Sequence, residues 1–215
     1  MSLQRSCFQV IATDEQIEYT NNIVNYSINN HSVPNIWDSD SAKKSNTYFY
    51  RFIGSLGEVV FADVYNLSRH KKSFGAEDGQ DYGNDFELEI NNKIYKIDLK
   101  SMHRKNDIFK DYYVLNIPSR QLHRDTSKTD LYYCISIHTK QNKFYISFLG
   151  FINKEDICSG KKGILYTAGT TRVRGDTSTF KFLQDTYEIE FKDFTPPIIK
   201  KDFEKLNGFK IIKIC

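Results

Sequence analysis

The feature that most constrains the fold of this chain is a strict alternation of polar and apolar residues from Asp85 to Ile90, followed by Asn91-Asn92 and a second strand-like run from Lys93 to Lys100. Alternation with a period of two is typical of a β-strand that buries one face. Asparagine tolerates the positive φ angles of a two-residue hairpin turn. The sequence therefore predicts a β-hairpin over residues 85–100 with one apolar face packed on a core.

The expected turn also fixes which residues lie opposite one another. With two turn residues, Ile90 pairs with Lys93, so Asp85 lies across from Asp98 and Glu87 lies across from Lys96. Side chains alternate between the two faces of a strand, which places Asp85, Asp98 and Lys100 on one face. Two directly opposed carboxylates destabilise a hairpin unless something offsets their repulsion.

A divalent cation between the two aspartates is one explanation for this arrangement. Mg²⁺ binds one or two carboxylates, keeps several waters and completes its shell with phosphate oxygens. Lys100 would lie close enough to orient a water or to offset negative charge on a phosphate. The alternative is an ordinary solvated hairpin face, in which Glu87 pairs with Lys96 and the aspartates face water.

The remaining periodicities predict an α+β or mixed α/β domain. Apolar residues recur at helical spacing over residues 14–30 and 47–67, and Gly54 and Gly57 within the second helix indicate a closely packed neighbour. The other expected elements are a strand at 112–117, a hairpin over 130–151 turned at Gln141-Asn142, a short helix after Asn153, a polar loop at 167–178, a strand at 185–192 and a helix at 198–206.

Composition favours a soluble cytoplasmic protein. Residues 1–16 contain no long apolar run that would indicate a secretory signal, and no stretch approaches the roughly 20 apolar residues of a membrane helix. The four cysteines are far apart, which argues against a zinc cluster or a disulfide framework. Neither a phosphate-binding G-x-x-x-x-G-K-[ST] loop nor a G-x-S-x-G motif is present, so ATP-driven and acyl-transfer enzymes are not indicated.

The acidic residues and lysine of the hairpin resemble the motif of the PD-(D/E)xK nuclease superfamily. The matching residues are Asn84-Asp85 and, after the turn, Asp98-Leu99-Lys100; Asn84 replaces the proline that gives the motif its name. That family also carries a glutamate on the helix before the sheet, and Glu58 fits this position. The resemblance implies an α+β fold with a restriction-endonuclease-like core, in which a mixed or antiparallel central sheet is flanked by helices. It also implies Mg²⁺-dependent hydrolysis of a phosphodiester, usually in DNA.

Carried onto this chain, the resemblance implies that Asp85, Asp98 and Glu58 hold the metal. Mn²⁺ should substitute for Mg²⁺, because it accepts the same oxygen ligands. Lys100 would position or activate the water. A second acid-x-Lys run, Glu190-Phe-Lys192, shows that the short motif alone is weak evidence. The first run is distinguished by an opposed acid at hairpin spacing, by the upstream helix that bears Glu58 and by the strand that follows.

Double-stranded DNA is the expected partner, although the net charge of +3 requires local clusters to supply the attraction. The basic residues expected at the DNA are Arg104, Lys105, Arg120, Arg124, Arg172 and Arg174. We expect a single nuclease domain over residues 1–215, with its catalytic core at about 47–151 and candidate recognition or dimerisation elements at 152–215. A type II restriction enzyme or a phage or mobile-element nuclease fits this description, and cutting both strands symmetrically would require a homodimer. The alternative function is a non-catalytic nucleic-acid-binding module that keeps the fold.

Overall fold

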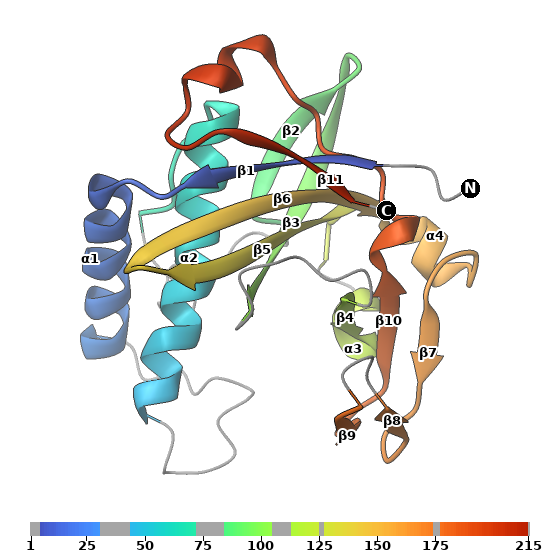
Figure 1. Ribbon diagram of the computed structural model, residues 1–215. Coiled ribbons are helices and arrows are strands. Elements are labelled where there is room, and N and C mark those ends of the chain that lie inside the picture. Colours follow the sequence, from blue (N-terminus) through green and yellow to red (C-terminus); the bar gives the residue numbers. More distant parts are fainter. Residues whose placement is uncertain are drawn as a thin grey trace.

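Six strands form a mixed central sheet in the order β11-β1-β6-β5-β3-β2 (Figure 1). The computed structural model describes residues 5–30, 44–71, 84–104, 113–124, 127–173 and 177–214. The strands are β1 (Arg5–Ile11), β2 (Phe86–Ile90), β3 (Lys93–Arg104), β5 (Leu131–Lys140), β6 (Lys143–Asn153) and β11 (Lys210–Ile214). Neighbours are antiparallel except β3 and β5, which are parallel, so the fold is α+β as expected.

Two long helices, α1 (Asp14–Asn30) and α2 (Lys44–Tyr65), lie on one face of this sheet (Figure 1). Helix α2 contributes apolar side chains such as Leu56, Val60 and Phe61 to the same buried cluster as Ile97 and Leu99 of β3. Burial of these side chains is the main term that holds the helix on the sheet.

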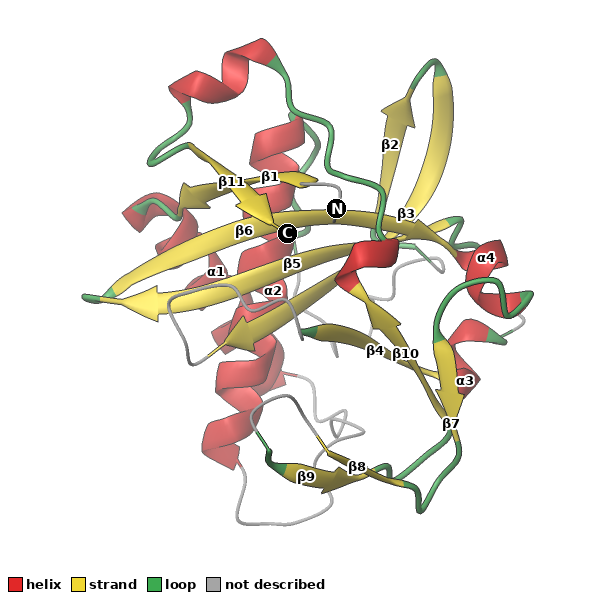
Figure 2. Ribbon diagram, turned by 45° about the vertical axis from the view of Figure 1, so that its right-hand side comes forward, coloured by secondary structure: helices red, strands yellow, loops and turns green. Residues whose placement is uncertain are grey.

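The opposite face of the sheet is covered mainly by a second sheet, so the expected covering by helices holds fully for one face only. This sheet has the order β4-β10-β7 and shares a second buried cluster with Tyr132 and Cys134 of β5 (Figure 2). Its strands are β4 (Val114–Pro118), β7 (Ile164–Tyr166) and β10 (Thr186–Glu190), and the short helices α3 (Ser119–Leu122) and α4 (Lys154–Cys158) adjoin it.

Both predicted hairpins form with the expected registers. Phe86 pairs with Ile97 and Ile90 pairs with Lys93, while Lys140 pairs with Lys143 in the β5–β6 hairpin. All four turn residues have positive φ: Asn91 and Asn92 at 51° and 63°, Gln141 and Asn142 at 50° and 59°. These values are those of a type I′ turn, whose twist matches that of the strands.

Several segments in the N-terminal and C-terminal parts of the chain, and one near residue 170, differ from the sequence-based expectations. Strands β1 and β11 were not predicted, although they complete one edge of the central sheet. The helix expected at 198–206 is only a short 3₁₀ segment, Lys201–Lys205, because Phe203 is its one buried residue and cannot support a longer amphipathic helix. The polar loop expected at 167–178 instead contains β8 (Thr171–Val173), which pairs with β9 (Thr179–Lys181).

Gly208 lies in the turn between the C-terminal 3₁₀ segment and β11. Its φ is +64°, and an added Cβ would meet the side chain of Ile11 at 2.5 Å. Glycine is required here for both reasons, since other residues rarely adopt this φ and none would fit against Ile11. No helix in the described ranges is long and apolar enough to span a membrane.

We expect the cysteines to differ sharply in their reactivity. Burial raises the pKa of Cys7 to about 11 and raises that of Cys134 further, whereas Cys158 is exposed. Because the thiolate is the reactive form, iodoacetamide at about pH 8 should label Cys158 rapidly and should reach Cys7 and Cys134 only after unfolding. Mass spectrometry of the labelled peptides measures this order, and rapid native labelling of Cys134 would contradict the packing of β5.

Candidate active site

Glu58 lies on α2 at the point where this helix comes closest to β3. An added Cβ on the preceding residue, Gly57, would lie 1.9 Å from the Oγ of Ser101 on β3, so only glycine permits this approach. Gly54 has nothing within 4 Å of such a Cβ, and the close neighbour that its presence suggested is absent. The Glu58 side chain is 17% exposed and lies at the border of the core.

Asp85 lies one residue before β2 and closes the end of the hairpin. Its backbone N–H donates to the carbonyl of Ile97 at 2.8 Å, and its carboxylate Oδ2 accepts the N–H of Leu99 at 2.6 Å. Strand β2 pairs with β3 only up to Ile97, so the Asp85 carboxylate takes the place of a strand carbonyl for the next exposed donor. This contact fixes the Asp85 carboxyl at the edge of β3.

Asp98 and Lys100 lie on the face of β3 opposite to α2. The Lys100 Nζ is 2.5 Å from Asp98 Oδ1 and lies 5.7 Å from the centre of the Tyr132 ring. Gln121 of α3 donates through Nε2 to Asp98 Oδ2 at 3.3 Å. Gln121 was missed from the sequence, because nothing in a short polar segment after Pro118 indicates that it folds back onto β3.

The electrostatics of Asp85 show that three acidic side chains gather at this edge of the sheet. Burial of its carboxyl group raises the pKa of Asp85 well above the ordinary value, and the charges of Asp98 and Glu58 raise it further. Lys100 and the hydrogen bond from the Leu99 amide act in the opposite direction and only partly offset this rise. The sequence-predicted residues Glu58, Asp98 and Lys100 therefore lie close enough to Asp85 for their charges to shift its pKa.

This arrangement predicts that Asp85→Asn flattens the pH dependence of stability in the metal-free protein. Below the ordinary pKa of aspartate, the carboxyl is protonated in both the folded and the unfolded states and contributes nothing. As the pH rises, the unfolded chain loses this proton while the folded chain retains it, so the wild-type free energy of unfolding falls. Urea unfolding in EDTA between about pH 4 and pH 8 measures both slopes. Parallel slopes for the variant and the wild type would contradict the raised pKa.

The donor chemistry of these residues fits a hard divalent cation. Glu58, Asp85 and Asp98 offer carboxylate oxygens, which Mg²⁺ and Mn²⁺ prefer. Burial is the main cause of the raised pKa of Asp85, and a cation would offset the charges of Asp98 and Glu58 that add to it. In the described part of the chain, however, no three His, Cys, Asp or Glu side chains are arranged so that they could enclose a metal ion as they stand. Lys100 and Gln121 each contact one oxygen of Asp98, so a metal ion there would bind beside these contacts or displace them.

Two further side chains make contacts that the sequence did not indicate. The His70 ring contacts Glu58 and the backbone of Asp85. Asp63 accepts hydrogen bonds from Arg69 and Gln16. These contacts join α2 to residues outside it, which spacing along one helix cannot reveal.

The basic residues proposed for DNA contact fall into three groups. Arg120 and Arg124 are exposed beside Gln121, near the acidic cluster. Arg104 packs over the ring of Tyr113 and donates to the Val114 carbonyl, and Arg172 forms an ion pair with Glu188. Lys105 and Arg174 lie outside the described residues. The first group is therefore best placed to reach a ligand at the site.

The second acid-x-Lys run, Glu190-Phe-Lys192, is less buried. Lys192 forms an ion pair with Glu190, and their side chains are 75% and 44% exposed, against 21% for Lys100 and 15% for Asp98. Burial, not the short motif, therefore distinguishes Asp98 and Lys100 from this pair. Comparison with known proteins adds no relative, because no family model, no curated protein and no solved structure matches this chain.

Proposed function

We propose that this protein is a divalent-metal-dependent DNA endonuclease with a restriction-endonuclease-like core. The observation that carries the proposal is the gathering of the Glu58, Asp85 and Asp98 carboxyls with Lys100 held on Asp98. The order of elements supports it: helix α2 bears the glutamate, hairpin β2–β3 bears the two aspartates and the lysine, and β5 runs parallel to β3.

Glu58, Asp85 and Asp98 would hold the metal, which when bound supplies a Lewis acid and a water of lowered pKa. Asp98 orients the Lys100 ammonium through their ion pair, which places a positive charge beside the acidic edge. That ammonium would bind the scissile phosphate and offset the negative charge that develops on it. Gln121 restrains the other oxygen of Asp98 and so limits its rotation.

Exposed Arg120 and Arg124 would contact DNA phosphates beside the site. Cutting both strands at one position would require two copies of the site, so a homodimer is part of the proposal. A restriction system, a phage or a mobile element would each use such an enzyme.

A non-catalytic nucleic-acid-binding module is the second candidate function. The observation that favours it is that Lys100 and Gln121 already occupy both oxygens of Asp98. In this case the buried acids would be a retained structural feature, and the basic surface alone would act.

Incubation of supercoiled plasmid with the purified protein tests the first function against the second. We expect nicked or linear DNA with Mg²⁺ or Mn²⁺ and none with EDTA. Retention of plasmid in a gel without cleavage in any divalent metal would favour the binding module, and cleavage that persists in EDTA would contradict a metal-dependent site.

A further inference from the structure

His70 joins two of the candidate site residues through its two ring nitrogens. Its Nε2 lies 2.8 Å from the carbonyl oxygen of Asp85, and its Nδ1 lies 3.2 Å from Glu58 Oε2. A carbonyl oxygen can only accept, so Nε2 donates to Asp85. Nδ1 faces Glu58, where a hydrogen bond needs a second proton, carried either by Nδ1 or by the carboxyl group. The ring also stacks on Phe86, with centroids 4.6 Å apart and planes at 10°.

These contacts determine what His70 is able to do. With one nitrogen on a backbone carbonyl and the other on a carboxyl group, the ring presents neither nitrogen to a substrate. It instead ties the helix that carries Glu58 to the first residue of the hairpin, across gaps of 12 and 15 residues in the sequence. Such a residue acts through the groups that it holds.

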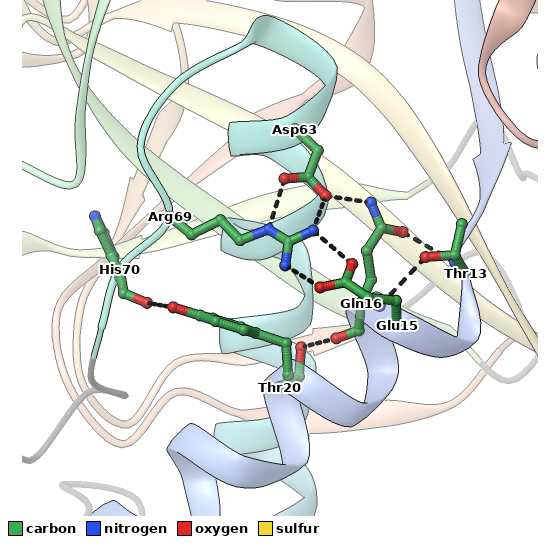
Figure 3. A network of polar contacts seen from close by, with 8 residues as sticks. Thr13, Glu15, Gln16, Thr20, Asp63, Arg69 and His70 are labelled. Carbon is green, nitrogen blue, oxygen red and sulfur yellow. Dashed lines mark hydrogen bonds and ion pairs between the residues drawn. The ribbon is translucent and has the colours of Figure 1, made fainter.

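The chain around His70 is itself held by an unusually dense polar network (Figure 3). The Arg69 guanidinium makes two hydrogen bonds to Glu15 of α1, at 2.6 and 2.7 Å, and two to Asp63 of α2, both at 2.6 Å. Gln16 donates to the same Asp63 carboxylate at 2.6 Å, and the Tyr19 hydroxyl donates to the His70 carbonyl at 3.0 Å. Both helices therefore fix the backbone on which the imidazole is mounted.

The Glu58 carboxyl is attached through three rotatable bonds, so its position depends on the groups that it contacts. A hydrogen bond between the fixed ring nitrogen and Oε2 opposes rotation about these bonds, and the hydrogen bond to the Asp85 carbonyl keeps the hairpin end in place.

We propose that His70 is a positioning residue that orients Glu58 and the start of the hairpin for metal binding, with Arg69 as its anchor. This inference rests on the proposed function, since it assigns Glu58 to the metal. Residues that support metal ligands in this way typically change metal affinity 10–100-fold when they are removed.

The test compares the His70→Ala and His70→Gln variants with His123→Ala, which removes an exposed histidine whose ring lies near that of Tyr187. Mn²⁺ binding to the protein without DNA is measured by calorimetry, and the Mg²⁺ concentration for half-maximal plasmid cleavage is measured in parallel. We expect His70→Ala to weaken Mn²⁺ binding and to raise the Mg²⁺ requirement about tenfold or more. His70→Gln, whose amide can replace one hydrogen bond, should recover part of the loss, and His123→Ala should match the wild type.

Several outcomes would overturn the inference. If His70→Ala lowers the unfolding temperature but binds Mn²⁺ as tightly as the wild type, then His70 is merely structural. If His70→Ala does not fold, the His70→Gln variant decides, and wild-type metal affinity in it would have the same meaning.

Failure of the proposed function is recognised separately, because the wild type itself then neither binds Mn²⁺ nor cuts DNA. In that case a double-mutant cycle between His70→Gln and Glu58→Gln, read as shifts of the unfolding midpoint, decides whether His70 orients Glu58. Additive shifts would refute the contact, and non-additive shifts would support it.

Discussion

Replacement of Asp98 by asparagine or of Lys100 by alanine is expected to reduce plasmid cleavage by about 10²–10³-fold or more while leaving retention of DNA in a gel largely intact. Asp98→Asn removes a charged metal ligand and the carboxylate that orients Lys100. Lys100→Ala removes the ammonium that would lie beside the phosphate. DNA retention should persist because most phosphate contacts would come from basic residues outside this pair.

The second acid-x-Lys run provides a matched control for this prediction. Lys192→Ala removes a lysine two residues after an acid on a strand, as Lys100→Ala does, but from an exposed ion pair. Exposed pairs contribute little to stability, and this one is separate from the candidate site, so cleavage should remain at the wild-type rate. Normal cutting by either Asp98→Asn or Lys100→Ala would show that the assigned roles are wrong.

The second large effect is expected at Gly57. An added methyl group would overlap the Oγ and Cβ of Ser101, at 1.9 and 2.9 Å, so α2 must move away from β3. Overpacking of this kind costs about 1–3 kcal/mol, which exceeds the gain of up to about 1 kcal/mol that alanine has over glycine in a helix. We expect Gly57→Ala to lower the free energy of unfolding in urea, and Gly57→Val to lower it further.

Gly54→Ala is the control for Gly57→Ala, since it lies one turn away on the same helix and an added Cβ there meets nothing within 4 Å. It should be neutral or stabilising by up to about 1 kcal/mol. Because Glu58 follows Gly57 directly, Gly57→Ala should also reduce cleavage more than its loss of stability explains. Equal stabilities of the two variants would contradict the close contact between α2 and β3.

The parts of the fold that the sequence revealed are those governed by local rules. The hairpins were predicted because asparagine and glutamine turns join alternating runs, and the register that pairs Glu87 with Lys96 followed from turn length alone. Helix α1 was predicted with its observed bounds, because its apolar stripe and its capping residues lie within one segment.

The parts that the sequence did not reveal depend on distant partners. Strands β1 and β11 are short, and they become strands only because β6 offers one of them an edge and they pair with each other. The same limit applies to the candidate site. The hairpin indicated Asp85, Asp98 and Lys100, but Gln121 and His70 reach them through folded segments whose sequences carry no signal for that contact.

The proposed metal at the acidic edge of β3 is tested most directly by anomalous diffraction from crystals soaked in Mn²⁺. Our account predicts a strong peak beside the carboxyl oxygens of Asp85 and Asp98, on the side of β3 where Lys100 contacts Asp98 Oδ1. A well-ordered site without a peak, or a Mn²⁺ ion bound only elsewhere on the molecule, would contradict it.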